Sequence, residues 1–388
     1  MDKLAKGEIL VTGWTDPDWE PAFKKAGAII TDQGGRTSHA AIKAREVGAT
    51  ATVGTGDATL TIRDGQLITV STAEGNTGFI YDGEARWDEK EIDLSQIEIP
   101  KTDVMLILNH PDKAFEYSAL PNKGIGLMRM EFIINNTIRV HPMALRHSEK
   151  ISYKKVRREI EELTQHCANK QDYFILRLEE ATANIAAAFH PKDVIVRMSD
   201  FKSNEYANLN GGCAFKPKEE NPMIGFRGAS LYYYPLYQKA FEMECEAMKL
   251  VREDMGLTNV KLMLPFVRNV AEAQKVIQLM GNKGFKRGID GLQLYMMLEI
   301  PSNALLEEEF AKYFDCFSIG SNDLTQLTLG ADRDSELLRE VFAPFDQAVK
   351  LLIIMAIEKA NALGVKLDFA SRLPVIIRNM PNFWWSAG

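Results

Sequence analysis

The sequence has few cysteines, no long apolar run and no excess of basic residues. Its four cysteines, spread over 388 residues, form no C-x-x-C pair: Cys167, Cys213, Cys245 and Cys316. Zinc and disulfide-exchange motifs therefore find no support, and sparse, unpaired cysteines fit a reducing cytoplasm. No run of 18 apolar residues occurs, so we expect no membrane span, and the first residues lack the apolar core of a signal peptide.

The charge balance argues against a general nucleic-acid binder. Lysine and arginine total 46 against 53 aspartates and glutamates, which gives a formal net charge of -7. Hydrophobic residues make up 46% and charged residues 26%, as in ordinary globular proteins. A chain of this length is too long for one small domain, so we expect two or three. Local clusters of arginine could still bind a small anion.

Residues 1–90 are predicted to form a small α/β domain of mostly β character. Short apolar runs bounded by glycine, threonine and aspartate predict a helix over 38–48 and strands over 7–13, 27–32, 49–56, 66–71 and 78–83. Residues 91–102 are charged and lack a clear amphipathic period. We interpret them as a linker.

Residues 103–388 show a different pattern, in which apolar strands alternate with helices. Strands are predicted over 104–109, 124–130, 193–200, 260–266, 292–300 and 316–323, and helices around 150–188, 236–255, 270–283 and 335–363. Such alternation predicts a parallel sheet covered by helices. The size matches a (β/α)8 barrel, whose active site lies where the strands end in loops.

Two arginines are predicted to stand at strand ends. Arg129 ends the run GIGLMR, and Arg197 ends DVIVR. A guanidinium is a planar, permanently charged fork that suits carboxylate or phosphate, so two of them could hold a ligand that carries both groups. For either arginine alone, a salt bridge at the barrel rim is the simpler interpretation. Arg227, in NPMIGFRGAS, is predicted to lie on a loop, where a solvated arginine is the simpler interpretation.

Carboxylates are also predicted to follow two strands. Glu299 comes after LYMML, Asp323 comes after CFSIGSN, and Arg333 lies ten residues beyond Asp323. Carboxylates with oxygen-bearing neighbours suit Mg²⁺, which keeps few protein ligands besides water and substrate phosphate. Helix capping by Asn322 and Asp323 is the alternative, and both roles can coexist.

A histidine stands at a predicted helix start in the segment TDQGGRTSHAAIKAREVG. Gly34 and Gly35 allow close approach of the backbone to an anion, Thr37 and Ser38 offer hydroxyls, and His39 begins the helix. The free N–H groups and the dipole at a helix N-terminus favour negative charge, so His39 could carry a phosphoryl group. A capping turn with an incidental histidine is the equally weighted alternative on spacing alone.

These motifs, in this order, resemble the PEP-utilising enzymes, a family that acts on phosphoenolpyruvate (PEP). GGRTSHAAIKARE resembles the signature of the family's swivelling phosphohistidine domain, of β/β/α architecture, and the later segments resemble its PEP-binding TIM-type barrel. SDFKSNEYANL, EENPMIGFRGAS, EIPSNALL and GSNDLTQLTLGADRDS are most similar to the synthase branch. The resemblance extends to about residue 365.

The resemblance implies roles for individual residues. His39 is then the phosphorylated residue, and Glu299 and Asp323 hold Mg²⁺. PEP or pyruvate is then bound by Arg129, Arg197, Ser321, Asn322 and Arg333. Arg227 is a further candidate at the transferring phosphoryl group. The implied reaction transfers phosphate from phosphohistidine to the enolate of pyruvate; the whole family enzyme charges its histidine from ATP and releases AMP and phosphate.

The resemblance also has departures. The nucleotide-binding domain that precedes the histidine domain in the family has no counterpart, so we expect a separate ATP-binding domain or chain as a partner. Leu231 stands where the family usually has arginine. The family continues its last barrel strand into a Gly-Cys-Gly loop, whereas residues 368–388 read DFASRLPVIIRNMPNFWWSAG, without that cysteine. When the tail is translated back into codons and read from two bases later, it can give FCKPAPGDNPEYAEFLVERG, which resembles the family's ending. We therefore interpret residues 368–388 as a frameshift product. Without the usual ending, we expect an incomplete and poorly stable barrel.

Several interpretations remain open. The chain is either a synthase-type enzyme fragment, a phosphocarrier that takes phosphate on His39 but completes no cycle, or an inactive product. Pyruvate phosphate dikinase and Enzyme I of the sugar phosphotransferase system are the other family members considered. The resemblance also implies a homodimer through the barrel.

Overall fold

The computed structural model describes residues 4–15, 19–34, 40–41, 44, 49–73, 77–88 and 102–370. The chain divides into two compact units, Met1–Ile99 and Pro100–Gly388. The predicted linker lies almost entirely outside the described residues. So does most of the predicted tail segment, although Asp368, Phe369 and Ala370 are described.

The first unit contains a parallel sheet and a separate hairpin. The sheet has the order β1-β2-β3, with bounds Ile9–Thr12, Ala28–Thr31 and Thr50–Val53. The hairpin pairs β4 (Ile68–Ser71) with β5 (Phe79–Asp82) in antiparallel fashion. All five strands lie within the ranges predicted from the sequence. Short helices α1 (Glu20–Phe23) and α3 (Ala58–Thr61) accompany them.

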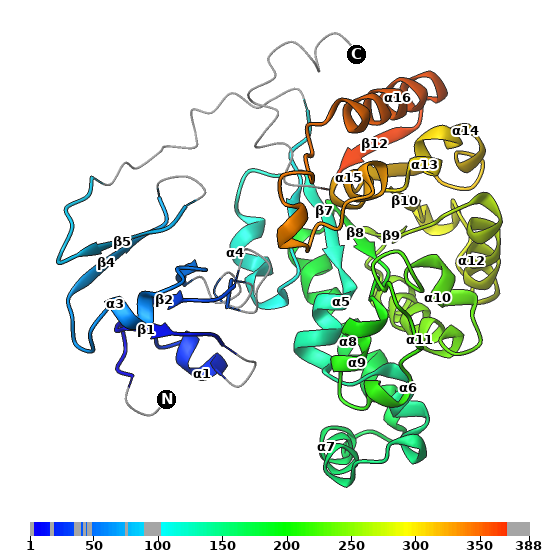
Figure 1. Ribbon diagram of the computed structural model, residues 1–388. Helices are drawn as coiled ribbons and strands as arrows, with labels where there is room; N and C mark the ends of the chain where they lie inside the picture. Colours follow the sequence, from blue (N-terminus) through cyan, green and yellow to red (C-terminus); the bar gives the residue numbers. More distant parts are fainter. Residues whose placement is uncertain are drawn as a thin grey trace. The chain divides into compact units, whose positions relative to one another are not determined.

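The described part of the second unit is built on a parallel sheet of seven strands in chain order, β6 to β12. The strands are Leu106–Ile107, Gly124–Arg129, Asp193–Arg197, Val260–Leu264, Leu294–Leu298, Cys316–Ile319 and Lys366–Phe369. Each described pairing is parallel, and helices run along the outside of the curled sheet (Figure 1). Over the described residues this is an incomplete TIM-type barrel in an α/β chain, as the sequence predicted.

The main helices of this unit connect successive strands. They are α4 (Ala114–Ser118), α5 (Met130–Ile133), α6 (Pro142–Arg146), α7 (Lys154–Thr164), α8 (Lys170–Phe189), α9 (Ser203–Asn208), α10 (Ala229–Tyr233), α11 (Gln238–Lys249), α12 (Val270–Asn282), α13 (Pro301–Leu305), α14 (Glu307–Phe310), α15 (Ser321–Leu329) and α16 (Gln347–Leu363). No described helix is long and apolar enough to cross a membrane.

Two predicted helices needed correction. The range 150–188 holds two helices, because Asn169 and Asp172 form a capping box that starts α8. The range 335–363 holds a short 3-10 helix at Glu336–Leu338, and its α-helix begins only at Gln347, where Asp346 accepts a hydrogen bond from the N–H of Ala348. Pro344 lies just before this cap and disfavours a helical conformation in the residue preceding it.

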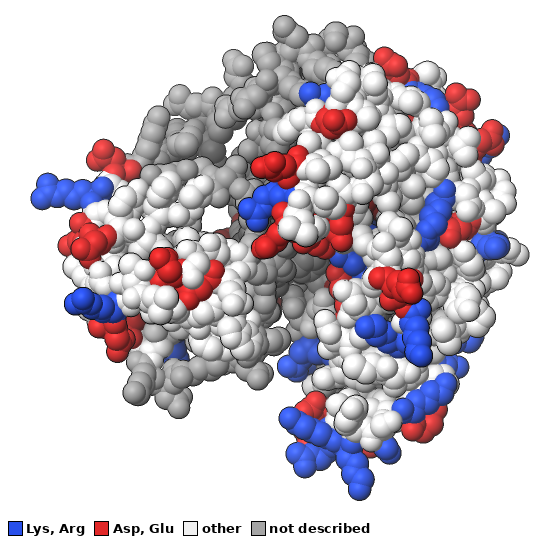
Figure 2. All heavy atoms as spheres, viewed as in Figure 1, with Lys and Arg blue, Asp and Glu red and all other residues white. Residues whose placement is uncertain are grey.

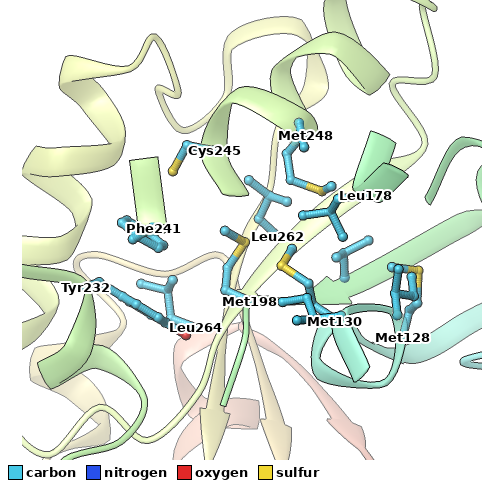
Figure 3. Packing of buried hydrophobic residues seen from close by; sticks show 14 of the residues in the cluster. Met128, Met130, Leu178, Met198, Tyr232, Phe241, Cys245, Met248, Leu262 and Leu264 are labelled. Atoms are coloured by element: carbon cyan, nitrogen blue, oxygen red, sulfur yellow. The ribbon is translucent and has the colours of Figure 1, made fainter. Parts of the chain in front are cut away.

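The core of the second unit lies between the sheet and the outer helices. Figure 3 shows Met130 and Met198 packed close to Leu178 of α8 and Leu262 of β9. The strands β8 and β10 are buried along nearly their whole length, as expected for parallel strands covered by helices. Leu231 is also buried in this core, so it packs against apolar neighbours.

Candidate active site

The candidate site lies at the carboxyl ends of the barrel strands. Arg129 is the last residue of β7 and Arg197 the last residue of β8, and the two are register partners. Glu299 directly follows β10, and Asp323 lies in the first turn of α15, which follows β11. Because the strands are parallel and in chain order, these side chains project from one rim of the sheet.

Arg197 is held by carboxylates on two sides. One Nη2–H donates to Oε1 of Glu131, and Nη1 lies 3.6 Å from Oδ2 of Asp200. Burial opposes the charge of Arg197, but Glu131, Asp200 and Glu299 outweigh that effect and raise the pKa of the guanidinium. Among the described residues, its buried Nε–H has no hydrogen-bond acceptor. An unsatisfied buried donor is costly, so this group is suited to receive an anionic ligand.

All three nitrogens of the Arg227 guanidinium donate hydrogen bonds to carboxylates of the site. Its Nε and Nη2 donate to the two oxygens of Asp200 at 3.0 and 2.6 Å, and Nη1 donates to Oδ1 of Asp323 at 3.0 Å. Its side chain is only 2% exposed. Burial opposes ionisation of Asp200, yet Arg227 and Arg197 lower the pKa of that carboxyl below its ordinary value.

Asp323 bridges two arginines. Its Oδ1 accepts from Arg227, and its Oδ2 accepts from Nη1 of Arg333 at 3.2 Å. The first turn of a helix favours a carboxylate because its N–H groups and the helix dipole are positive there. The N-cap of α15 is Gly320, and among the described residues no side-chain capping hydrogen bond is made there. The predicted alternative of capping by Asn322 and Asp323 is therefore not observed, and the Asp323 carboxylate binds the two arginines instead.

Glu299 is a buried carboxyl whose ionisation is suppressed. Burial, followed by the charges of Asp323 and Asp200, raises the pKa of Glu299 to about 8. Its Oε1 accepts a hydrogen bond of 2.7 Å from the backbone N–H of Phe266. A Cβ atom added at Gly320 would lie 2.8 Å from Oε2 of Glu299, so glycine at that strand end leaves room for the carboxylate.

Glu299 and Asp323 fit a hard divalent cation. A bound cation would relieve the repulsion that raises the pKa of Glu299. Within the described ranges, no group of three or more His, Cys, Asp or Glu side chains is arranged to hold a metal ion. A two-carboxylate set suits Mg²⁺, which keeps several waters and takes substrate oxygens as its remaining ligands.

The other predicted residues of the rim lie nearby on the same elements. Ser321 is buried at the start of α15 and Asn322 is exposed beside it. Arg129 places its guanidinium 6.0 Å from the ring centroid of Phe132. Figure 2 shows charged side chains of both signs scattered over the visible face of the second unit, with basic ones gathered around α7.

Sequence reasoning missed Asp200 and Phe266 and gave Glu131 no role. Asp200 stands three residues after Arg197, so its place directly beyond a strand end was a usable signal. Phe266 is an apolar residue without any chemical signature in the sequence. Its relevance comes from its backbone conformation and from the arginines that flank it.

The predicted phosphohistidine loop lies mostly outside the described residues. This applies to His39, Gly35, Thr37 and Ser38, whereas Gly34 is described and has a φ of 115°. A Cβ atom added at Gly54 would lie 2.5 Å from the carbonyl oxygen of Gly34, so the close approach of these two loops requires glycine.

Comparisons with known proteins agree with this architecture. Residues 4–75 match the mobile domain of PEP-utilising enzymes, and residues 84–372 match their PEP-binding domain. Phosphoenolpyruvate synthase of Deinococcus radiodurans is 52% identical over 374 residues, which cover 96% of this chain and 48% of that protein. The Escherichia coli and Aquifex aeolicus phosphoenolpyruvate synthases are 51% and 47% identical, over 96% of this chain and 47% and 49% of theirs.

The chain spans about half the length of the curated relatives that it matches. Two domain models of the PEP-utilising enzymes together match residues 4–75 and 84–372 of the chain. The chain therefore belongs to the PEP-utilising enzymes, of which it comprises a mobile domain and a PEP-binding domain.

Proposed function

We propose that this chain carries out reversible phosphoryl transfer between PEP and His39. In the direction of PEP breakdown, the bond between phosphorus and the enol oxygen breaks and a bond between phosphorus and a ring nitrogen of His39 forms. The enolate that leaves takes up a proton and becomes pyruvate. In the opposite direction, phosphohistidine converts pyruvate into PEP, the step that gives a synthase its product.

The observation that carries the proposal is the buried pair Arg197 and Arg227 beside Glu299 and Asp323. PEP bears one carboxylate and one phosphate on a three-carbon skeleton, so it needs two separated cationic groups. Arg197 keeps one buried N–H available, and Arg227 can exchange Asp323 for a phosphoryl oxygen while Asp200 still holds its other edge. Arginine forks in a buried site bind such groups strongly.

Each remaining residue has a proposed role. Arg129, as register partner of Arg197, binds the substrate from the adjacent strand, and Ser321, Asn322 and Arg333 bind it from the α15 side. Arg227 acts at the phosphoryl group in transfer. We propose that Glu299 and Asp323 hold Mg²⁺, which when bound supplies positive charge against the enolate and phosphoryl oxygens.

We further propose that the chain acts within the larger reaction of a pyruvate, water dikinase. In that reaction ATP charges the histidine, AMP and phosphate are released, and the charged histidine then phosphorylates pyruvate. The ATP-binding part is then a separate domain or chain. We propose a homodimer through the barrel and a cytoplasmic location, in keeping with sparse, unpaired cysteines.

The test is phosphorylation of the purified chain by PEP labelled with ³²P in the presence of Mg²⁺. We expect acid-labile, base-stable label on the protein and one pyruvate released for each label. His39→Ala should abolish the label, whereas His166→Ala, at an exposed histidine of the second unit, should keep it.

Different outcomes separate the proposals. Label that persists in His39→Ala would contradict His39 as the acceptor. A folded wild-type chain that takes no label would contradict the half-reaction. Label that forms but cannot be passed on to added unlabelled pyruvate would indicate a phosphocarrier only.

A further inference from the structure

Phe266 has a backbone conformation that is unusual for its residue type. It follows Pro265 at the end of β9 and has a φ of 50°, in the left-handed region that bulky side chains rarely adopt. Its side chain is buried, with 2% of the residue exposed. Strained residues of this kind persist only where the surroundings fix them, and they gather at functional sites.

The surroundings of Phe266 fix it from two directions. Gly228 approaches so closely that an added Cβ atom would lie 2.5 Å from the Cβ of Phe266, and the N–H of Ala229 donates to the carbonyl of Pro265 at 3.1 Å. On the other side, the amide of Asn303 donates to the carbonyl of Val267 at 2.7 Å. The segment after β9 is thus bound both to the Arg227 loop and to α13, the helix that follows β10.

The left-handed conformation gives Phe266 two contacts at once. Its N–H donates to Oε1 of Glu299 at 2.7 Å, and its ring lies 4.1 Å from Cζ of Arg227. Arg268 also contacts the ring, with Cζ 4.8 Å from the centroid. One residue therefore contacts both a candidate metal ligand and a candidate phosphoryl-binding arginine. An aromatic face attracts a guanidinium most strongly where water is excluded.

We propose that Phe266 is a positioning residue that keeps Arg227 in place while this arginine exchanges Asp323 for the phosphoryl group. The inference rests on the proposed PEP-dependent transfer. When Nη1 of Arg227 leaves Asp323, the guanidinium keeps Asp200 at one edge and the Phe266 ring at its face. The N–H of Phe266 meanwhile fixes Oε1 of Glu299, so the opposite oxygen is the one left for a cation.

The test compares Phe266→Leu with Phe266→Tyr in the full chain. Leucine keeps the backbone N–H and the apolar volume but removes the aromatic face, whereas tyrosine keeps that face. Phe189→Leu is the matched control, because Phe189 of α8 is also 2% exposed and belongs to the core cluster. The measurements are the dissociation constant of PEP by calorimetry with Mn²⁺ present, and the Mn²⁺ affinity without PEP by electron paramagnetic resonance.

We expect Phe266→Leu to weaken PEP binding roughly thirtyfold, the size of a desolvated cation–π contact. Its Mn²⁺ affinity should stay within about twofold, because the N–H to Glu299 remains. Phe266→Tyr should restore PEP binding to within about threefold of wild type, and Phe189→Leu should leave both affinities unchanged.

Three results would overturn the inference. They are unchanged PEP binding in Phe266→Leu, an equal loss in Phe189→Leu, and a loss in Phe266→Tyr as large as in the leucine variant. A folded wild-type chain that binds Mn²⁺ but no PEP would instead overturn the proposed function, and the ligand-exchange role of Phe266 with it.

Discussion

Asp200 binds Arg227 through both of its carboxylate oxygens, at 3.0 Å from Nε and 2.6 Å from Nη2. The same Oδ2 lies 3.6 Å from Nη1 of Arg197. One carboxylate that the sequence did not single out therefore orients both buried arginines of the candidate site. Its loss should disturb folding and ligand binding together.

Asp200→Asn tests this relationship. The change leaves Arg227 buried without its charged partner, and removal of one member of a buried ion pair costs about 3 kcal/mol or more of unfolding free energy. Urea denaturation measures the loss. Asp334→Asn, at an exposed aspartate that pairs with Lys202, serves as control and should cost about 1 kcal/mol or less. Equal effects of the two substitutions would contradict the inferred role of Asp200.

Glu299 should make cation binding depend on pH. The carboxyl must lose its proton to bind a metal, and its pKa is raised to about 8. As the pH is raised toward 8, the apparent affinity for Mn²⁺ should therefore increase about tenfold per pH unit, and above pH 8 it should stay constant. Electron paramagnetic resonance of free Mn²⁺ measures this profile.

Two variants separate this effect from general burial. Glu299→Gln should abolish the Mn²⁺ binding that depends on this group. Glu307→Gln removes another buried glutamate whose pKa burial raises to about 8, yet it lies on α14 and should leave the profile unchanged. A profile that shifts only in Glu307→Gln would contradict the assignment of Glu299.

Glu244 should make stability fall as pH rises. Burial raises its pKa to about 8, against an ordinary value of 4.5. Between pH 4.5 and pH 8 the folded chain keeps a proton on Glu244 that the unfolded chain releases. The contribution of Glu244 to the unfolding free energy is therefore fully present below pH 4.5 and is lost as the pH rises to 8. The slope from this group is at most about 1.4 kcal/mol per pH unit.

Glu244→Gln should flatten that part of the dependence, as measured by urea denaturation at pH 5, 6.5 and 8. Glutamine can still accept from the hydroxyls of Ser199 and Tyr237, which bind Oε1 of Glu244 at 2.6 and 2.7 Å. Glu246→Gln, at an exposed glutamate of the same helix, should keep the wild-type slope. An unchanged slope in Glu244→Gln would show that the titrating group lies elsewhere.

Gly320→Ala should damage the site without backbone strain. The added Cβ atom would lie 2.8 Å from Cβ and Oε2 of Glu299 and 3.1 Å from Cγ of Met297. We expect a loss of about 1–3 kcal/mol in unfolding free energy and weaker Mn²⁺ binding. In Gly281→Ala, near the end of α12, the new methyl group meets no atom within 4 Å, so the variant should be as stable as wild type or slightly more so.

The sequence predicted most of the strands well because each of these is a short apolar run with a clear end. Strand β12 (Lys366–Phe369) was missed, because its sequence KLDF includes a lysine and an aspartate. The clear strand ends also predicted that Arg129, Arg197 and Glu299 lie at the rim of the sheet, since each residue ends or directly follows such a run. The start of α16 was predicted too early, because the range 335–363 was read as continuous although Pro344 and the cap at Asp346 delay the helix.

The contacts between loops could not be predicted from the sequence. Asp200 and Arg227 are 27 residues apart, and Arg227 and Asp323 are 96 apart, so their pairing depends on how the loops fold over the rim. Phe266 gave no signal, because a left-handed backbone at a phenylalanine is imposed by Gly228 and Asn303 on either side. Tertiary packing decides such features.

The alternation of acidic and basic side chains across the rim limits which substitutions related proteins can tolerate there. Glu131, Arg197, Asp200, Arg227, Asp323 and Arg333 form one chain of contacts in which each charge borders the opposite sign. A mutation at one member leaves a neighbour uncompensated, so it is tolerated only if that neighbour changes as well. Descendants of a common ancestor should therefore keep these six residues as a block or replace them in matched pairs.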